Sequence, residues 1–201
     1  LVGSEMCIRD RSPIMLLIIN VLGDGIPGMA LAKEVSDKRI MNRKPIARSE
    51  SFFGGGLIEV IIRQTVVFAI VSLSAFYIGY KLDLGIAGVS PEAAGRTMAF
   101  LVTGWTSVLH VLTVRSRKNL YKYRFRDNPQ LYISCAAMFA VLGLLALIPP
   151  VAGAMGLCSL SGRQWLIVAG LTVVPTLVAE YGKLWDAVKS HAAEKNRVQL
   201  R

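Results

Sequence analysis

Long apolar stretches alternate with short polar ones along this chain of 201 residues. A helix needs about 20 predominantly apolar residues to cross the hydrocarbon core of a bilayer. Five stretches come close to this length, at about residues 13–32, 57–80, 96–114, 131–151 and 164–180. The pattern therefore predicts an all-α fold, a polytopic transmembrane helix bundle with five spans.

The two ends of the chain are predicted to lie outside this bundle. Residues 1–12 show no helix periodicity and no initial methionine, so we interpret them as a non-native or disordered tail of a C-terminal fragment. A signal peptide is the alternative, but no small-residue cleavage site follows. The transmembrane domain is expected over residues 13–182, and the polar residues 183–201 are typical of a cytoplasmic tail.

Composition argues against an ordinary soluble domain, because 53% of residues are hydrophobic, 18% are charged and the mean hydropathy is +0.49. The net charge of +10 comes from basic runs between the apolar stretches. Residues 115–126 alternate basic and aromatic side chains, which single-stranded nucleic acid can also attract. Between two spans, contact with anionic head groups is favoured. We expect membrane lipid as a partner and no nucleic acid.

The distribution of Lys and Arg predicts the orientation. Residues 33–51 and 115–126 carry six basic residues each, and five follow in 183–201. The other connections hold Lys81, Arg96 and Arg163. By the positive-inside rule the first group is cytoplasmic, so the C-terminus is predicted in the cytoplasm. The expected location is an integral position in a bacterial inner (plasma) membrane.

The first predicted span contains a carboxylate near its middle. Asp24 and Asn20 are its only strongly polar side chains, and a spacing of four places both on one helix face. A carboxylate at that depth costs about 2.5–3.5 kcal/mol on insertion scales, so such residues usually mark an ion or proton path. Gly23, Gly25 and Pro27 weaken the helix around it. We expect a local break that leaves carbonyl oxygens beside the carboxylate.

Polar side chains also follow one face of the third predicted span, at three- and four-residue steps: Thr103, Thr106, Ser107, His110 and Thr113. One interpretation is that these groups bond to their own helix and to neighbouring helices, which is common in membrane bundles. The other is that the face lines a cavity that contains Asp24. The candidate cavity-lining residues are Gly23, Thr106, Ser107 and His110.

Two linked segments resemble a known family. Residues 20–31 read Asn-Val-Leu-Gly-Asp-Gly-Ile-Pro-Gly-Met-Ala-Leu, and residues 37–45 read Asp-Lys-Arg-Ile-Met-Asn-Arg-Lys-Pro. Together they are similar to the sixth transmembrane helix and the following cytoplasmic loop of P-type cation-transporting ATPases, most of all the calcium-pump-like group. The resemblance implies that the five spans are helices six to ten, the C-terminal transmembrane domain of such a pump.

The resemblance also implies a metal site, in which Asn20 and Asp24 coordinate the transported cation, Ca²⁺ or a similar ion. The threonine that the family places three residues after the asparagine is Gly23 here. The glutamate of helix eight falls at or near His110, and histidine is a poor calcium ligand. It could instead carry a counter-transported proton or a fixed positive charge. Calcium takes six to eight oxygens, so further ligands would come from helices four and five and from carbonyl groups.

By the same resemblance, ATP and Mg²⁺ are cofactors only of the intact parent pump, whose remaining domains and helices are the expected partners. The phosphorylated Asp-Lys-Thr-Gly-Thr segment does not occur in this sequence, nor does a phosphate-binding loop. The chain alone is therefore expected not to be catalytic.

Two other functions remain open at this point. A proton-coupled secondary transporter or a channel-like protein would use Asp24 and His110 as proton relays. A structural membrane anchor would tolerate leucine in place of Asp24.

Overall fold

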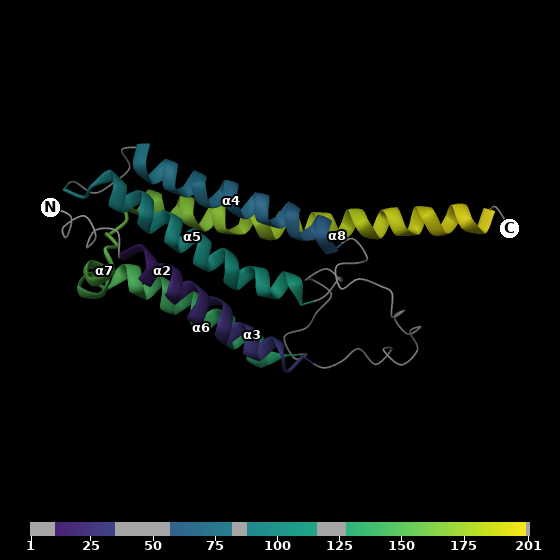
Figure 1. Cartoon of the computed structure of the whole chain (residues 1–201), viewed down its shortest axis with the longest axis horizontal. Coiled ribbons are helices and arrows are strands. Elements are labelled where there is room, and N and C mark those ends of the chain that lie inside the picture. The colour runs from purple at the N-terminus through teal and green to yellow at the C-terminus, as the bar shows by residue number, and fades with distance from the viewer. Residues whose placement is uncertain (1–10, 35–56, 82–87, 116–127, 200–201) are drawn as a thin grey trace.

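The computed structural model describes residues 11–34, 57–81, 88–115 and 128–199. Every regular element in these ranges is a helix, and five helical stretches are long and apolar enough to cross a membrane: Ile14–Leu31, Leu57–Lys81, Pro91–Val114, Pro129–Leu147 and Gly162–Trp185. Figure 1 shows them side by side along the long axis of the molecule. The predicted all-α fold with five spans is confirmed.

Some of the sequence predictions fall on parts of the chain outside the described residues. They concern most of the N-terminal tail, most of the connection at 33–51, much of the loop before the third span and the basic segment after it. The first helix begins at Arg11, so residues 11 and 12, assigned above to the tail, are helical.

The first span is built from three consecutive helical segments, α2 (Arg11–Ile18), η1 (Ile19–Gly25) and α3 (Ile26–Leu31). The segment η1 is a π-helix, in which hydrogen bonds reach the fifth residue and widen the turn. Its end stays helical, with φ −66° and ψ −52° at Gly25. The expected break is therefore wrong in its form, because the backbone widens around Asp24 and does not unwind.

The second and third spans are α4 (Leu57–Lys81) and α5 (Pro91–Val114). The helix α5 begins five residues before the predicted boundary at residue 96. Ser90 is its N-cap, with a side-chain oxygen that accepts a hydrogen bond of 3.3 Å from the backbone N–H of Ala93. Pro91 also favours a helix start, because its missing N–H would have no intrahelical acceptor there, and the acid of Glu92 suits the helix dipole.

The fourth predicted span is divided into α6 (Pro129–Leu147) and the short α7 (Pro149–Met155). Ile148, between them, has φ −85° and ψ 107°, which is extended backbone. A residue before proline avoids the helical region for steric reasons, and this explains why one helix over 131–151 is wrong. Gly156, with φ 72°, ends α7 in the left-handed conformation that glycine adopts easily.

The fifth span belongs to α8 (Gly162–Gln199), which continues without interruption past the predicted end of the transmembrane domain at residue 182. Figure 1 shows this helix projecting beyond the other four spans towards the C-terminus. Pro175 lies inside it and does not end it. Residues 183–199 are therefore a helical extension of the last span.

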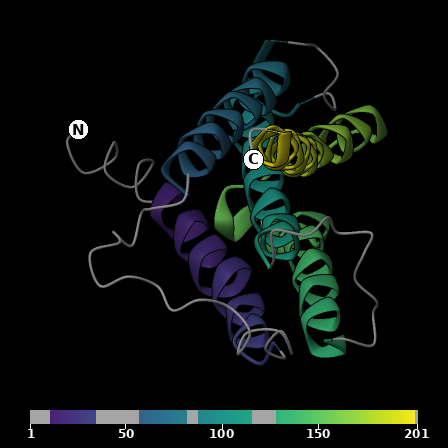
Figure 2. The same cartoon turned by 90° about the vertical axis from the view of Figure 1, so that its right-hand side faces the viewer.

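The helix α5 is the centre of the bundle, in contact with α4, α8, α6 and η1 (Figure 2). It approaches α4 closely, because a Cβ atom built on Gly79 would lie 2.7 Å from the Cα of Gly95. Small residues at such crossings allow helix backbones to pack in a membrane. On its other side, the Trp105 ring stacks on Phe139 of α6 at 4.4 Å between centroids.

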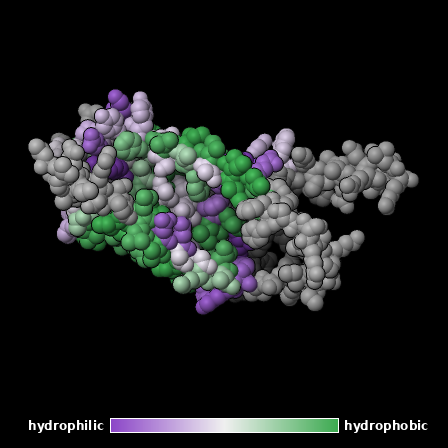
Figure 3. Space-filling view, in the orientation of Figure 1, coloured by the Kyte–Doolittle hydropathy of each residue, from purple (hydrophilic) through white to green (hydrophobic). Residues whose placement is uncertain are grey.

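The surface matches a membrane setting. Figure 3 shows broad hydrophobic areas over the bundle, with hydrophilic side chains towards both ends and a smaller hydrophilic group between them on this face. Large exposed apolar side chains occur on α2, α4, α6 and α8. Such side chains are stable against lipid and would be unfavourable in water.

Candidate functional site

The predicted ligands Asn20 and Asp24 both lie on the π-helical segment η1, and both side chains are exposed in this chain. Neither side chain makes a hydrogen bond to another described residue. The neighbouring Ile19 and Gly23 are buried. The segment thus packs its apolar side inward and presents its amide and carboxylate on the outer side, where a further segment could reach them.

The inward side of η1 rests on α5. A Cβ atom built on Gly104 would lie 3.6 Å from the Cγ1 of Ile19, so the two helices are in close contact there. Gly23 is buried on the same side, and a Cβ atom there would meet only its own helix, 3.8 Å from Ile19. Gly23 is therefore buried beside Ile19, and Ile19 makes the close contact with the central helix.

The polar face of α5 divides into two kinds of position. Thr103 forms a hydrogen bond of 2.7 Å with Ser72 of α4, which fits the interpretation that this face joins helices. Thr106 is 3% exposed, and its hydroxyl has no hydrogen-bond partner among the described residues. Ser107 is half-buried. A buried hydroxyl without a partner is unfavourable, so Thr106 is the position on this face that most needs a ligand or water.

His110 belongs to a network at the end of α5. Its Nδ1 lies 3.1 Å from the hydroxyl of Thr113, and its ring meets Phe68 edge-on at 5.0 Å. The carbonyl of Thr113 accepts a hydrogen bond of 2.6 Å from Lys183, which also pairs with Glu180 at 2.8 Å. This network joins the end of α5 to α8.

The described residues do not by themselves form a complete metal site. They contain no group of three or more His, Cys, Asp or Glu side chains that could hold an ion. Calcium takes six to eight oxygen ligands at 2.3–2.6 Å as a rule, and Asn20 and Asp24 supply two side chains. Their joint role in cation binding stays a prediction, as does the cavity with Gly23, Thr106, Ser107 and His110.

A second polar cluster, which the sequence analysis did not identify, lies just beyond the C-terminal end of the site-bearing span. It consists of Glu34 with Arg115 and Asn128, which follow it by 81 and 94 residues in the sequence. The only local signal was Asn128 directly before Pro129, the typical start of a helix. Nothing in the sequence shows that Glu34 and Arg115 meet.

These features define a class of protein, a polytopic helical membrane protein with an ionisable side chain inside a span. The chain belongs to the family described as "Cation transporting ATPase, C-terminus", whose model matches residues 12–185. The resemblance found in the sequence is confirmed at the level of this family.

Curated relatives cover most of the chain. It is 30% identical over 183 residues to "Calcium-transporting ATPase 1" of Bacillus cereus, which is 86% of this chain and 20% of the relative. It is 27% identical over 172 residues to "Calcium-transporting ATPase" of Bacillus subtilis, 83% of this chain and 18% of the relative. A mouse protein, "Calcium-transporting ATPase type 2C member 2", is 25% identical over 182 residues, 89% of this chain and 18% of the relative. The chain spans about a fifth of the length of these relatives.

Proposed function

We propose that this chain is the membrane-embedded, cation-binding part of an ATP-driven P-type pump, and that Asn20 and Asp24 are ligands of the transported ion. The observation that carries the proposal is the placement of an amide and a carboxylate on a π-helical turn in mid-span. Single π turns inside helices occur frequently at functional sites. An ionisable residue within a span marks an ion path by default.

The ion is calcium or a similar hard cation. Carboxylate and amide oxygens are the ligands that calcium prefers. The relatives named above are calcium-transporting ATPases, and the match to them includes most of this chain. The outward placement of Asn20 and Asp24 leaves room for ligands from further helices of the same pump. ATP hydrolysis would take place on domains that this chain does not carry.

The topology follows from the charge distribution. The connections rich in Lys and Arg and the end of α8 lie on the cytoplasmic side of a bacterial inner membrane. The cytoplasmic connection after α3 would then lie where a phosphorylation domain can contact it. Lipid covers the apolar outer faces of α4 and α8, which carry large exposed side chains.

The test is the Asp24→Asn variant of the intact pump, reconstituted in lipid. Loss of one carboxylate charge should abolish calcium-dependent phosphorylation from ATP, or raise the half-saturating calcium concentration at least about 100-fold, since charge dominates binding of a hard cation. The matched control is Glu59→Gln, which neutralises an exposed carboxylate at the start of α4 and should leave the calcium dependence unchanged.

Equal calcium dependence in wild type and Asp24→Asn would refute the ligand assignment. Cation flux without any phosphorylated intermediate would favour a secondary transporter or a channel that uses Asp24 and His110. A fully active Asp24→Leu variant would favour the remaining alternative, that the chain is only a structural membrane anchor.

A further inference from the structure

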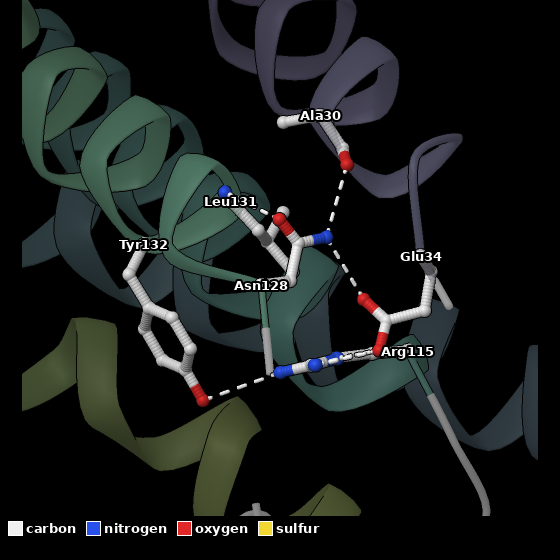
Figure 4. Close-up of polar contacts among 6 residues, drawn as sticks. All are labelled: Ala30, Glu34, Arg115, Asn128, Leu131 and Tyr132. Carbon is white, nitrogen blue, oxygen red and sulfur yellow. Dashed lines mark hydrogen bonds and ion pairs between the residues drawn. The ribbon is translucent and has the colours of Figure 1, made fainter. Parts of the chain in front are cut away.

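Three polar side chains join three helix ends on one side of the bundle (Figure 4). Glu34 follows the last turn of α3, Arg115 is the C-cap of α5, and Asn128 is the N-cap of α6. The Nε of Arg115 donates a hydrogen bond of 2.7 Å to Glu34 Oε1, and Asn128 Nδ2 donates one of 2.9 Å to Glu34 Oε2. Both carboxylate oxygens are thus engaged, each by a different helix.

Asn128 uses both ends of its amide. Its Oδ1 accepts a hydrogen bond of 3.1 Å from the backbone N–H of Leu131 and so caps the start of α6. Its Nδ2 also donates to the carbonyl of Ala30 at 3.1 Å, near the end of α3. The Asn128 side chain is only 5% exposed and forms hydrogen bonds with backbone groups at the ends of two helices, α6 and α3. Asn128 and Ala30 are 98 residues apart in the sequence.

Arg115 needs a counter-charge because its side chain is 1% exposed. Glu34 supplies this charge, and the hydroxyl of Tyr132 accepts a further hydrogen bond of 3.4 Å. The Glu34 side chain is 26% exposed, so the pair is buried on its Arg115 side, and breaking a pair with a buried partner is costly. The pair Glu92–Arg96 at the opposite end of α5 differs, since its side chains are 68% and 36% exposed and 3.8 Å apart. Such a pair contributes little.

The cluster has a mechanical relation to Asp24. Glu34 lies ten residues after Asp24, and the two are connected by the end of η1, by α3 and by the turn that follows α3. At the ordinary helical rise this corresponds to about 15 Å. The site-bearing span packs lightly, with 22% of its hydrophobic window buried, against 50% for α5. The hydrogen bonds of Glu34 and Asn128 therefore add to the packing of Ile19 on α5 in fixing the position of the span.

We propose that Glu34, Arg115 and Asn128 form a positioning clamp that sets the place of the Asn20/Asp24 turn relative to α5 and α6, and so sets the affinity for the transported cation. These are positioning residues, because none of them lies on the turn that bears the ligands. The proposal rests on the function proposed above and adds a determinant of affinity outside the ligand set.

The test uses the intact pump that carries this chain, reconstituted in lipid, with calcium alone as the varied ligand. Glu34→Gln and Arg115→Gln are each compared with the double variant and with Glu92→Gln as the matched control. Each single clamp variant should raise the half-saturating calcium concentration for phosphorylation about ten-fold, which corresponds to ~1.4 kcal/mol of coupling. The double variant should shift it by less than the two single effects combined, since the pair acts as a unit.

The maximal phosphorylation per folded molecule should stay near the wild-type level, because the ligands are intact. Arg115→Lys keeps the charge but not the forked geometry, so it should fold and show a smaller shift. If Arg115→Gln does not fold, the calcium dependence of Arg115→Lys is measured in its place. The Glu92→Gln control should behave as wild type.

An unchanged half-saturating calcium concentration in Glu34→Gln and Arg115→Lys would overturn the clamp, and so would an equal shift in Glu92→Gln. A loss of folded protein without a change in calcium dependence would also overturn it, since that is the result of a purely structural pair. A wild-type pump that shows no calcium-dependent phosphorylation would instead refute the proposed function, and the clamp with it.

Discussion

The central helix α5 and the site-bearing span α2–η1–α3 differ in a way that their hydrophobicity does not suggest. Over its most apolar 18 residues, α5 has a mean hydropathy of 1.5 and half of these residues are buried, whereas the first span has a mean hydropathy of 1.8 and only 22% of its residues are buried in this chain. The more apolar helix is thus the more exposed one. In a membrane, apolar side chains are as stable against lipid as against protein, so hydrophobicity does not determine which helix lies in the interior. Small residues that allow close packing and polar residues that form hydrogen bonds between helices determine it.

The strongest test of this difference is a bulky residue in the interior crossing. Gly95→Leu should destabilise the bundle by about 3 kcal/mol, because a Cβ atom there would already lie 2.8 Å from the carbonyl oxygen of Phe76. The free energy of unfolding in mixed detergent micelles measures this effect. Gly170→Leu on α8 is the control, since a Cβ atom there meets nothing within 4 Å. Similar losses for both variants would contradict the special role of the α4–α5 crossing.

A smaller effect should come from a hydroxyl that holds α5 to a distant loop. Thr97 is fully buried, and its Oγ1 accepts a hydrogen bond of 3.0 Å from the backbone N–H of Cys158. Thr97→Val should cost about 1–3 kcal/mol, because that N–H loses its partner. The buried Thr172 donates only to its own helix, to the carbonyl of Val168 at 2.8 Å. Thr172→Val should therefore change the free energy of unfolding much less, and equal costs would argue against a tie to the loop.

The smallest effect concerns the two sides of the site-bearing span. Ile19 is 5% exposed and packs on α5, whereas Val21 is 56% exposed. Ile19→Val should cost about 1 kcal/mol through lost packing. Val21→Ala should have almost no effect on the unfolding of this chain. If Val21→Ala destabilises the intact pump but not the isolated chain, then the outer side of the span is covered by other helices of the pump, as the proposed function requires.

The sequence predicted the helical parts of the candidate site but not their form. Asp24 and Asn20 were identified from their position in a span, which is local information. The glycines and the proline indicated a weakened helix, and the structure has a π-helical turn where a break was expected. A break and a π-helical turn both accommodate Pro27, which cannot donate a hydrogen bond to the carbonyl four residues before it. The segment that adopts the π-helical turn packs on α5 through Ile19, and a contact between two helices is not contained in any local pattern.

The sequence by itself determined the number of spans and their approximate limits, because crossing a bilayer depends on hydrophobicity summed over neighbouring residues. It also contained the segments that resemble the confirmed family. Only the tertiary structure decided which helix lies at the centre and which polar residues meet. Glu34 and Arg115 are 81 residues apart, and Glu34 and Asn128 are 94 apart. Such contacts depend on how whole helices pack against one another, and the hydrophobic pattern along a single helix does not specify that packing.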